Sequence, residues 1–295
     1  MVRTEPVVGH TRHHRDPANR LQLCGPAGIR TTLSLLKESL MTRMKYSGRI
    51  APNCPYHAPS LLTQGHIVAP TTITPPNPEW GPVAQYGPTV FGRSTAYDPA
   101  HNCEGNFMSY KNQPNNNCYA YGTNIASNSF PQPGRASEGS TPWSTAMTAD
   151  SVTRNAELDG LVVLPHQTLD ALLDDPTYRQ GVDGHFVALV FSPPESGFQG
   201  DPGAQWGGDY HWVRADEVDY ARRVIHWSQK DGGDQVTNFD FAGQPITDPT
   251  HACWTVNLGP VSGVDPSRPD DQHDVIVTYE FHTFMWVPAN GVTIL

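Results

Sequence analysis

Proline recurs so often in one part of this chain that long helices are excluded there. Residues 51–100 contain ten prolines and only three formal charges. Proline fixes φ and has no backbone N–H, so it interrupts helices and is confined to the edges of sheets. We therefore expect residues 51–100 to run as extended or polyproline-type chain. Coiled-coil and helical-repeat architectures are excluded by the same observation.

The proline-rich segment also carries large apolar side chains, among them Trp80, Tyr86 and Phe91. A disordered linker is usually poorer in such residues. The pattern therefore predicts that residues 51–100 wrap over a folded body, and that these three side chains hold the wrap in place.

Residues 1–50 form a basic arm on an otherwise acidic chain. They hold nine Lys and Arg against three Asp and Glu, whereas residues 51–295 hold ten against twenty-six. A helix is predicted over 31–44, and Met44 is an alternative start of translation. The acidic body repels nucleic acid and anionic membranes, so neither is expected as a partner. The arm is interpreted as a solvated tail, with homo- or hetero-assembly through it as the alternative.

The chain shows no targeting or membrane-spanning segment. Residues 1–14 lack the apolar run of a secretory signal. No stretch approaches the roughly 18 consecutive apolar residues that a membrane span requires. The localisation is therefore left unknown, with an extracellular or virion-associated place as the open possibility.

Residues 101–295 show a pattern that can build a core, with helices first and strands after them. This order is typical of an α+β fold. Helices are expected over 118–126 and 142–158 and from Pro165 through Leu173. Strands are expected over 185–191, 210–214, 222–227, 253–258 and 275–287.

Five cysteines are present, and their spacing does not fit a zinc site. Asn238 and Asp240 with Asp248 could suggest calcium ligation, but the alternating acidic loop of a calcium site is missing. These residues are interpreted as a cluster of turns. We expect no metal and no cofactor.

Cys118 is the candidate nucleophile. It follows an asparagine-rich loop and opens a predicted helix, where backbone N–H groups and the helix dipole favour a thiolate. A thiolate attacks acyl groups, and neighbouring N–H groups can stabilise the oxyanion. His211, at the start of a predicted strand, is the candidate base. On the next strand, Gln229 or His226 is expected to orient the imidazole.

Six short blocks of the sequence resemble a poorly characterised family found in bacteria and phages, and in molluscs under the label insoluble matrix shell protein. The resemblance covers residues 103–290. That family shows Trp-Ser-His-Lys where this chain reads Trp227-Ser228-Gln229-Lys230. The blocks are Asn117-Cys118-Tyr119, Phe130-Pro131-Gln132-Pro133-Gly134-Arg135, Asp159-Gly160-Leu161, Asp209-Tyr210-His211-Trp212-Val213-Arg214, Trp227-Ser228-Gln229-Lys230 and Thr247-Asp248-Pro249.

The order of Cys118 and His211 is also similar to that of the NlpC/P60 and CHAP cysteine amidases and peptidases. This likeness implies a papain-like α+β domain over 101–295, with a helix against an antiparallel sheet. It implies a cysteine-dependent hydrolase of an amide or peptide bond, acting on a peptide or peptidoglycan-like substrate. If a histidine normally orients the base, Gln229 must do so as an amide, or activity is reduced.

Two other functions are left open. Few charges, many prolines and glycines and a wrapping arm suit a non-catalytic structural subunit of a virion, shell or extracellular matrix. A carbohydrate-binding module is the third possibility, with a platform of tryptophans. The tryptophans considered for it are Trp206, Trp212, Trp227, Trp254 and Trp286.

Overall fold

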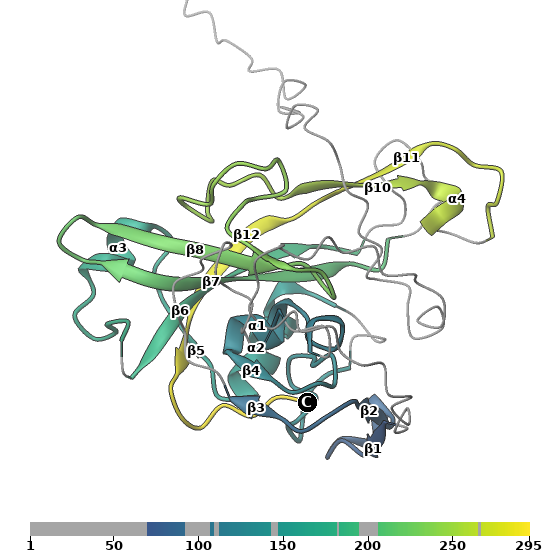
Figure 1. Cartoon of the computed structure of the whole chain (residues 1–295), viewed down its shortest axis with the longest axis horizontal. Coiled ribbons are helices and arrows are strands. Elements are labelled where there is room, and N and C mark those ends of the chain that lie inside the picture. Colours follow the sequence, from purple (N-terminus) through teal and green to yellow (C-terminus); the bar gives the residue numbers. More distant parts are fainter. Residues whose placement is uncertain are drawn as a thin grey trace, which may run out of the picture.

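The computed structural model describes residues 70–91, 107–108, 112–142, 147–181, 183–194, 206–264 and 267–295. Its architecture is α+β, as the sequence predicts, and is dominated by one antiparallel sheet (Figure 1). The basic arm 1–50 and its predicted helix lie outside the described residues. Within the described part, no helix has the length and apolar character needed to cross a membrane.

The main sheet has six strands in the order β5-β12-β6-β7-β8-β9. All five pairs of neighbouring strands are antiparallel. The long central strands alternate apolar side chains toward two separate core layers, because successive side chains point to opposite faces. The strands are β5 (Val162–Val163), β6 (Gly184–Ser192), β7 (Asp209–Asp219), β8 (Val224–Lys230), β9 (Val236–Thr237) and β12 (Glu280–Pro288).

One face of the sheet packs against α1 (Cys118–Thr123) and α2 (Ala149–Leu158), and we call it the α1 face. The other face packs against α3 (Leu169–Asp174) and a two-stranded ribbon, and we call it the ribbon face. The ribbon consists of β10 (Thr255–Pro260) and β11 (Asp274–Thr278), joined through the short α4 (Val261–Val264). In Figure 1 the ribbon projects beyond the main sheet.

The observed helices differ from the predicted ones mainly at their ends. The predicted helix 118–126 ends at Thr123 and is followed by the short strand β4 (Ile125–Ala126). The helix predicted from residue 142 begins only at Ala149, because Thr148 and Ser151 form a capping box there. Its predicted end before Asp159 matches the structure.

The strand predicted over 275–287 is two strands, β11 and β12, in different sheets. The break falls at Tyr279, whose backbone N–H donates to the Trp254 carbonyl and whose hydroxyl donates to Asp209 at 2.6 Å. These bonds turn the chain from the ribbon into the main sheet.

The described part of the proline-rich segment is extended and packed on the body. It contains β1 (Thr71–Ile73), β2 (Val83–Gln85) and β3 (Val90–Phe91), with a single 3₁₀ turn at Pro78–Trp80. Strand β3 pairs with β4, and the Trp80 Nε1–H donates to Ser140 Oγ at 2.8 Å.

Two of the three side chains expected to hold this segment on the body are exposed and do not pack on it. Tyr86 is 52% exposed and Phe91 is 72% exposed. Their backbones make the contacts instead, through strand pairing and a hydrogen bond from the Tyr86 N–H to the Asn128 carbonyl. The wrap is therefore held by polar and backbone interactions together with the buried Val83 and the packing of Val90 on the core of the α1 face.

Candidate functional site

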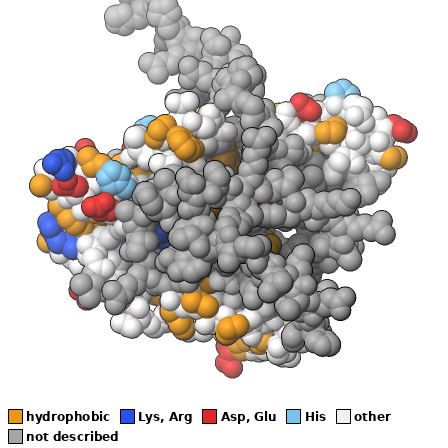
Figure 2. Space-filling view, viewed as in Figure 1, with side chains coloured by type: hydrophobic (Ala, Val, Ile, Leu, Met, Phe, Trp, Pro, Cys, Tyr) orange, Lys and Arg blue, Asp and Glu red, His pale blue; other side chains and the backbone are white. Residues whose placement is uncertain are grey.

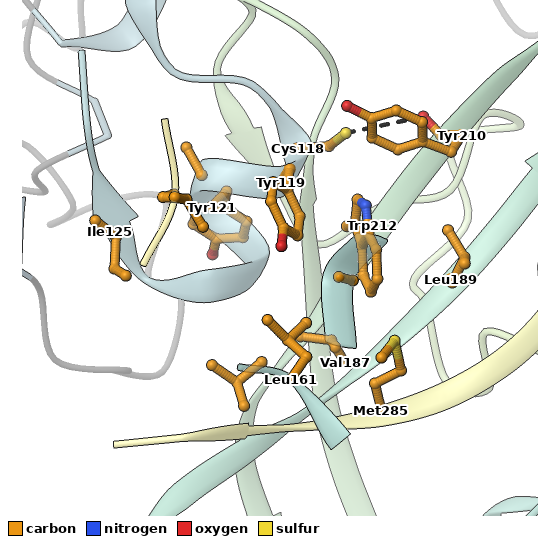
Figure 3. Close-up of a cluster of buried hydrophobic side chains, with 14 of the residues drawn as sticks. Cys118, Tyr119, Tyr121, Ile125, Leu161, Val187, Leu189, Tyr210, Trp212 and Met285 are labelled. Carbon is orange, nitrogen blue, oxygen red and sulfur yellow. Dashed lines mark hydrogen bonds between the residues drawn. The ribbon is translucent and has the colours of Figure 1, made fainter. Parts of the chain in front are cut away.

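Cys118 lies at the first position of α1, where the sequence predicts it. The Asn117 side chain caps the helix by accepting from the Ala120 N–H at 3.1 Å. The Cys118 side chain is 5% exposed and packs on the α1 face of the sheet. Figure 3 shows its thiol beside Tyr210, to whose carbonyl it donates across 3.9 Å.

This environment does not activate the thiol. Burial raises the pKa of Cys118 well above its ordinary value, and the nearby Asp209 carboxylate adds to the shift. The helix N-terminus was expected to lower this pKa, but a six-residue helix inside an apolar cluster does not offset the loss of solvent.

His211 lies on β7, but its imidazole is on the ribbon face. It packs against the rings of Phe241, Trp254 and Tyr279, with centroid distances of 5.5, 5.9 and 6.5 Å. Burial lowers the pKa of His211 to about 4, so the ring is neutral at pH 7. His211 is therefore part of the aromatic core on this face.

Gln229 is hydrogen-bonded to His211, as the sequence analysis expects. The two side chains meet at 2.6 Å, between Nε2 and Oε1. The Gln229 amide group donates to the Phe239 carbonyl at 2.7 Å, so its oxygen is free to accept from the imidazole. The network thereby assigns the proton of the neutral ring to Nε2.

The structure does not bring Cys118 and His211 together. Tyr210 and Trp212 pack in the same core layer as Cys118, and His211 lies between them in sequence, so its side chain points to the opposite face. His226 is exposed and lies three residues before Gln229 on β8, so its side chain points to the opposite face of the strand. It is therefore not the group that holds the imidazole. The catalytic roles of these four residues stay predictions.

A buried polar network that the sequence analysis missed lies on the α1 face, next to α1. The Arg214 guanidinium bonds Asp216, with Nε to Oδ1 at 2.8 Å, and lies 3.9 Å above the Tyr121 ring. The Ser228 hydroxyl bonds both Asp216 and, at 2.6 Å, the Tyr121 hydroxyl. This network ties α1 to β7 and β8. Only the presence of an arginine inside a predicted strand pointed to it.

Lys230 is fully buried and fixes the loop that precedes α1. Its ammonium donates to the carbonyls of Gln113, Asn116 and Gly232. Burial lowers the pKa of Lys230 to about 7, while nearby carboxylates oppose that shift. Lys230 thus holds β8 and this loop together.

Asp159, at the end of α2, likewise holds a loop in place through buried hydrogen bonds. It accepts from the Tyr119 hydroxyl at 2.8 Å, from the Gly134 N–H at 2.7 Å and from the Ser137 hydroxyl at 2.8 Å. Burial raises the pKa of Asp159 to about 6. Gly134 has φ +81°, and a Cβ there would lie 2.8 Å from Asn155 and Ser140 atoms, so the block requires glycine.

The remaining candidate features serve the fold. Asp240 accepts three backbone N–H groups in its turn, and Asp248 accepts from Thr250 and His251, so the interpretation as turns is confirmed. No group of three His, Cys, Asp or Glu that could hold a metal occurs among the described residues. The five tryptophans proposed as a sugar platform are at most 7% exposed, so they form core and not a platform: Trp206, Trp212, Trp227, Trp254 and Trp286.

The fold and site define an α+β protein in which buried polar side chains connect α1, its flanking loops and the sheet. Insoluble matrix shell protein 1 of Ruditapes philippinarum is 33% identical over 150 residues, which cover 51% of this chain and 76% of that protein. The chain belongs to the family of that protein. No family profile and no solved structure matches the chain.

Proposed function

We propose that this protein is a non-catalytic structural subunit of an extracellular matrix, shell or virion. One observation carries the proposal: Cys118 and His211 lie on opposite faces of the sheet, and the buried polar residues Lys230, Asp159 and Arg214 are engaged in internal hydrogen bonds. Residues that serve catalysis together would converge on one accessible place. Here Lys230, Asp159 and Arg214 hold loops and strands together.

Two further facts support this role. The similar protein of Ruditapes philippinarum carries the words matrix and shell in its name. Cys253 is disulfide-bonded, which is typical of proteins in an oxidising compartment such as the extracellular space.

A cysteine-dependent hydrolase of papain-like, NlpC/P60-like type is the second candidate. It is favoured by the position of Cys118 at a capped helix start and by the amide of Gln229 on His211. For this function, the His211 side chain would have to leave its aromatic pocket and cross to the α1 face.

Thiol labelling separates the two candidates. Native protein treated with iodoacetamide at pH 6 should leave Cys118 unlabelled, because its thiol is buried and its pKa is raised. Labelling should follow unfolding in guanidinium. Mass spectrometry of the peptide that contains Cys118 gives the readout, and rapid native labelling would favour the hydrolase.

A histidine variant provides the second readout. His211→Ala should lower the free energy of unfolding by about 1–3 kcal/mol, because Gln229 loses its buried partner. The matched control is His226→Ala on the neighbouring strand, where the side chain is exposed and a change within about 0.5 kcal/mol is expected. If His211→Ala left stability unchanged but altered Cys118 labelling, the structural proposal would fail.

A further inference from the structure

The sequence holds a single Asn-Gly pair, Asn290-Gly291, in the turn that follows β12. Both residues are exposed. In such a pair the backbone nitrogen of the second residue can attack the asparagine side chain, and glycine favours this attack because it has no Cβ to obstruct the approach. The pair is therefore a candidate site of spontaneous chemical modification.

The two reacting groups are not held by hydrogen bonds within the described part of the chain. Neither the Asn290 side-chain amide nor the Gly291 N–H bonds to another described residue. Gly291 has φ +89°, and a Cβ built on it would meet nothing within 4 Å, so the turn leaves room around its backbone. Asn257 differs on both counts, because its amide donates to Asp274 at 2.7 Å and a leucine follows it.

The turn is fixed at both ends by backbone hydrogen bonds. On one side the Ala289 N–H donates to the Asp183 carbonyl at 2.8 Å. On the other side the Thr293 N–H donates to the Asp159 carbonyl at 2.9 Å. A backbone of different length between residues 289 and 293 does not keep both bonds in this geometry.

The segment that follows the turn is docked on the core of the α1 face. Val292 and Ile294 are buried, and the Leu295 carbonyl accepts from the Gln132 N–H at 3.0 Å and from the Arg135 Nε at 2.8 Å. Among the described residues, Figure 2 shows no Lys or Arg side chain in the lowest part of the view, where this segment runs in Figure 1. A carboxylate created in the turn adds to the acidic charge of the body and finds no described cation on this face.

We propose that Asn290 is a site of succinimide formation, and that the isoaspartyl product loosens residues 292–295 from the body. The Gly291 nitrogen attacks Asn290 Cγ and bonds to it, the Cγ–Nδ2 bond breaks, and Nδ2 leaves as ammonia with the proton of the Gly291 N–H. Water then opens the ring. Breaking the bond between Cγ and the Gly291 nitrogen gives aspartate. Breaking the bond between the Asn290 carbonyl carbon and that nitrogen gives isoaspartate.

Isoaspartate changes the turn in two ways. The main chain runs through Cβ and Cγ of residue 290 and is longer by one carbon atom, and the former backbone carbonyl carbon carries a carboxylate. The extra atom lies between the hydrogen bonds of Ala289 and Thr293. Because Thr293 leads directly into the docked segment, weakening its bond to Asp159 releases residues 292–295 first.

This inference deepens the proposed structural role, because a matrix or shell subunit that is not replaced accumulates such a change with age. It rests on that role only for its meaning, since an exposed Asn-Gly pair reacts whatever the protein does. The labelling of Cys118 and the modification of Asn290 are measured separately. A modified Asn290 with a reactive Cys118 would overturn the structural role alone, and an unmodified Asn290 with an inert Cys118 would overturn this inference alone.

Ageing of the full chain tests the modification. Protein kept at mildly alkaline pH should lose the Asn290 amide progressively, because removal of the Gly291 N–H proton speeds the attack. Peptide mass spectrometry measures the mass gain at Asn290, and methylation by an isoaspartyl methyltransferase detects the isoaspartyl product. Asn257 in the same sample is the internal control and should stay unmodified. An unchanged Asn290, or equal modification of both asparagines, would overturn the proposal.

Hydrogen–deuterium exchange tests the loosening. In aged wild-type protein, the peptide covering residues 289–295 should exchange about fivefold faster or more, as expected for the loss of one net hydrogen bond. Aged Asn290→Gln is the matched control, because its longer side chain disfavours ring closure, and it should exchange like fresh protein. Fresh Asn290→Asp carries the charge without the extra backbone atom and should stay within about twofold of fresh wild type. No rise in aged wild type, or an equal rise in either variant, would overturn the loosening.

Discussion

At the scale of single residues, burial changes the charge of several polar side chains in this protein. His211 and His185 each have a pKa lowered to about 4, and burial is the first cause in both. Asp159 shifts the opposite way, to about 6. In each case burial favours the neutral form, so the folded protein and the unfolded chain bind protons differently across the acidic range.

His211 should make stability depend on pH between about 6.5 and 4. Its pKa is lower in the folded state, so its contribution is present above 6.5 and is lost as the pH falls through 4. His211→Asn removes this titration but leaves Asp159 and His185 unchanged. The difference in unfolding free energy between wild type and variant should therefore shrink as the pH falls.

Urea unfolding at pH 7, 5.5 and 4 measures this difference. His226→Asn, at an exposed histidine of the neighbouring strand, is measured in parallel as the control. A constant difference for His211→Asn would mean that this ring does not titrate as its burial requires.

At the scale of elements, α1 is too short to be stable alone and depends on its ends. Isolated helices shorter than about 12 residues are marginal, and α1 has six. Asn117 caps its start, and Asn124 ends it in the left-handed conformation with φ +60°. The Asn117 Nδ2 group also donates to the Pro131 carbonyl at 2.7 Å, so one residue fixes both the helix and the loop after it.

Asn117→Ala should destabilise the protein by about 2 kcal/mol, because the helix cap and the bond to Pro131 are lost together. Asn117→Asp is the matched variant: it keeps an oxygen that can cap the helix but loses the donor to Pro131. It should cost less than alanine. Thermal and urea unfolding provide the comparison, and equal losses for the two variants would show that the cap contributes nothing.

Whether a segment forms a helix or a strand was predictable where neighbouring residues in the sequence carry the signal. Strands β6, β7 and β8 follow apolar runs, and the end of α2 follows from Asp159-Gly160. The break at Tyr279 depends on contacts with Trp254 and Asp209, which are distant in the sequence, so no window of sequence shows it. The start of α2 is set by the local capping box of Thr148 and Ser151, a signal that the prediction from residue 142 did not use.

At the scale of the whole molecule, the candidate site depends on which face of β7 meets α1. The sequence shows that Tyr210 and Trp212 share one face and His211 the other. It does not show which face the helix covers. The pairing of Gln229 with His211 was predictable from the strand order, but the separation of Cys118 from the imidazole required the three-dimensional structure.

The described part of the proline-rich segment should resist proteolysis because specific polar contacts hold it. Trp80 Nε1 and Asn77 Nδ2 both donate to Ser140, at 2.8 and 2.9 Å. Trp80→Phe keeps a large ring but removes the indole N–H. Losing one net hydrogen bond of about 1 kcal/mol should raise the cleavage rate of residues 70–91 about fivefold, when cleavage follows the population of the open form.

Proteinase K suits this measurement because its broad specificity makes it insensitive to the substituted side chain, and mass spectrometry locates the cuts. Tyr86→Phe is the matched control, since the Tyr86 ring is 52% exposed and its backbone makes the contact with Asn128. The control should be cut at the wild-type rate. If wild-type residues 70–91 were cut as fast as in Trp80→Phe, the polar contacts with Ser140 would not be what holds this segment on the body.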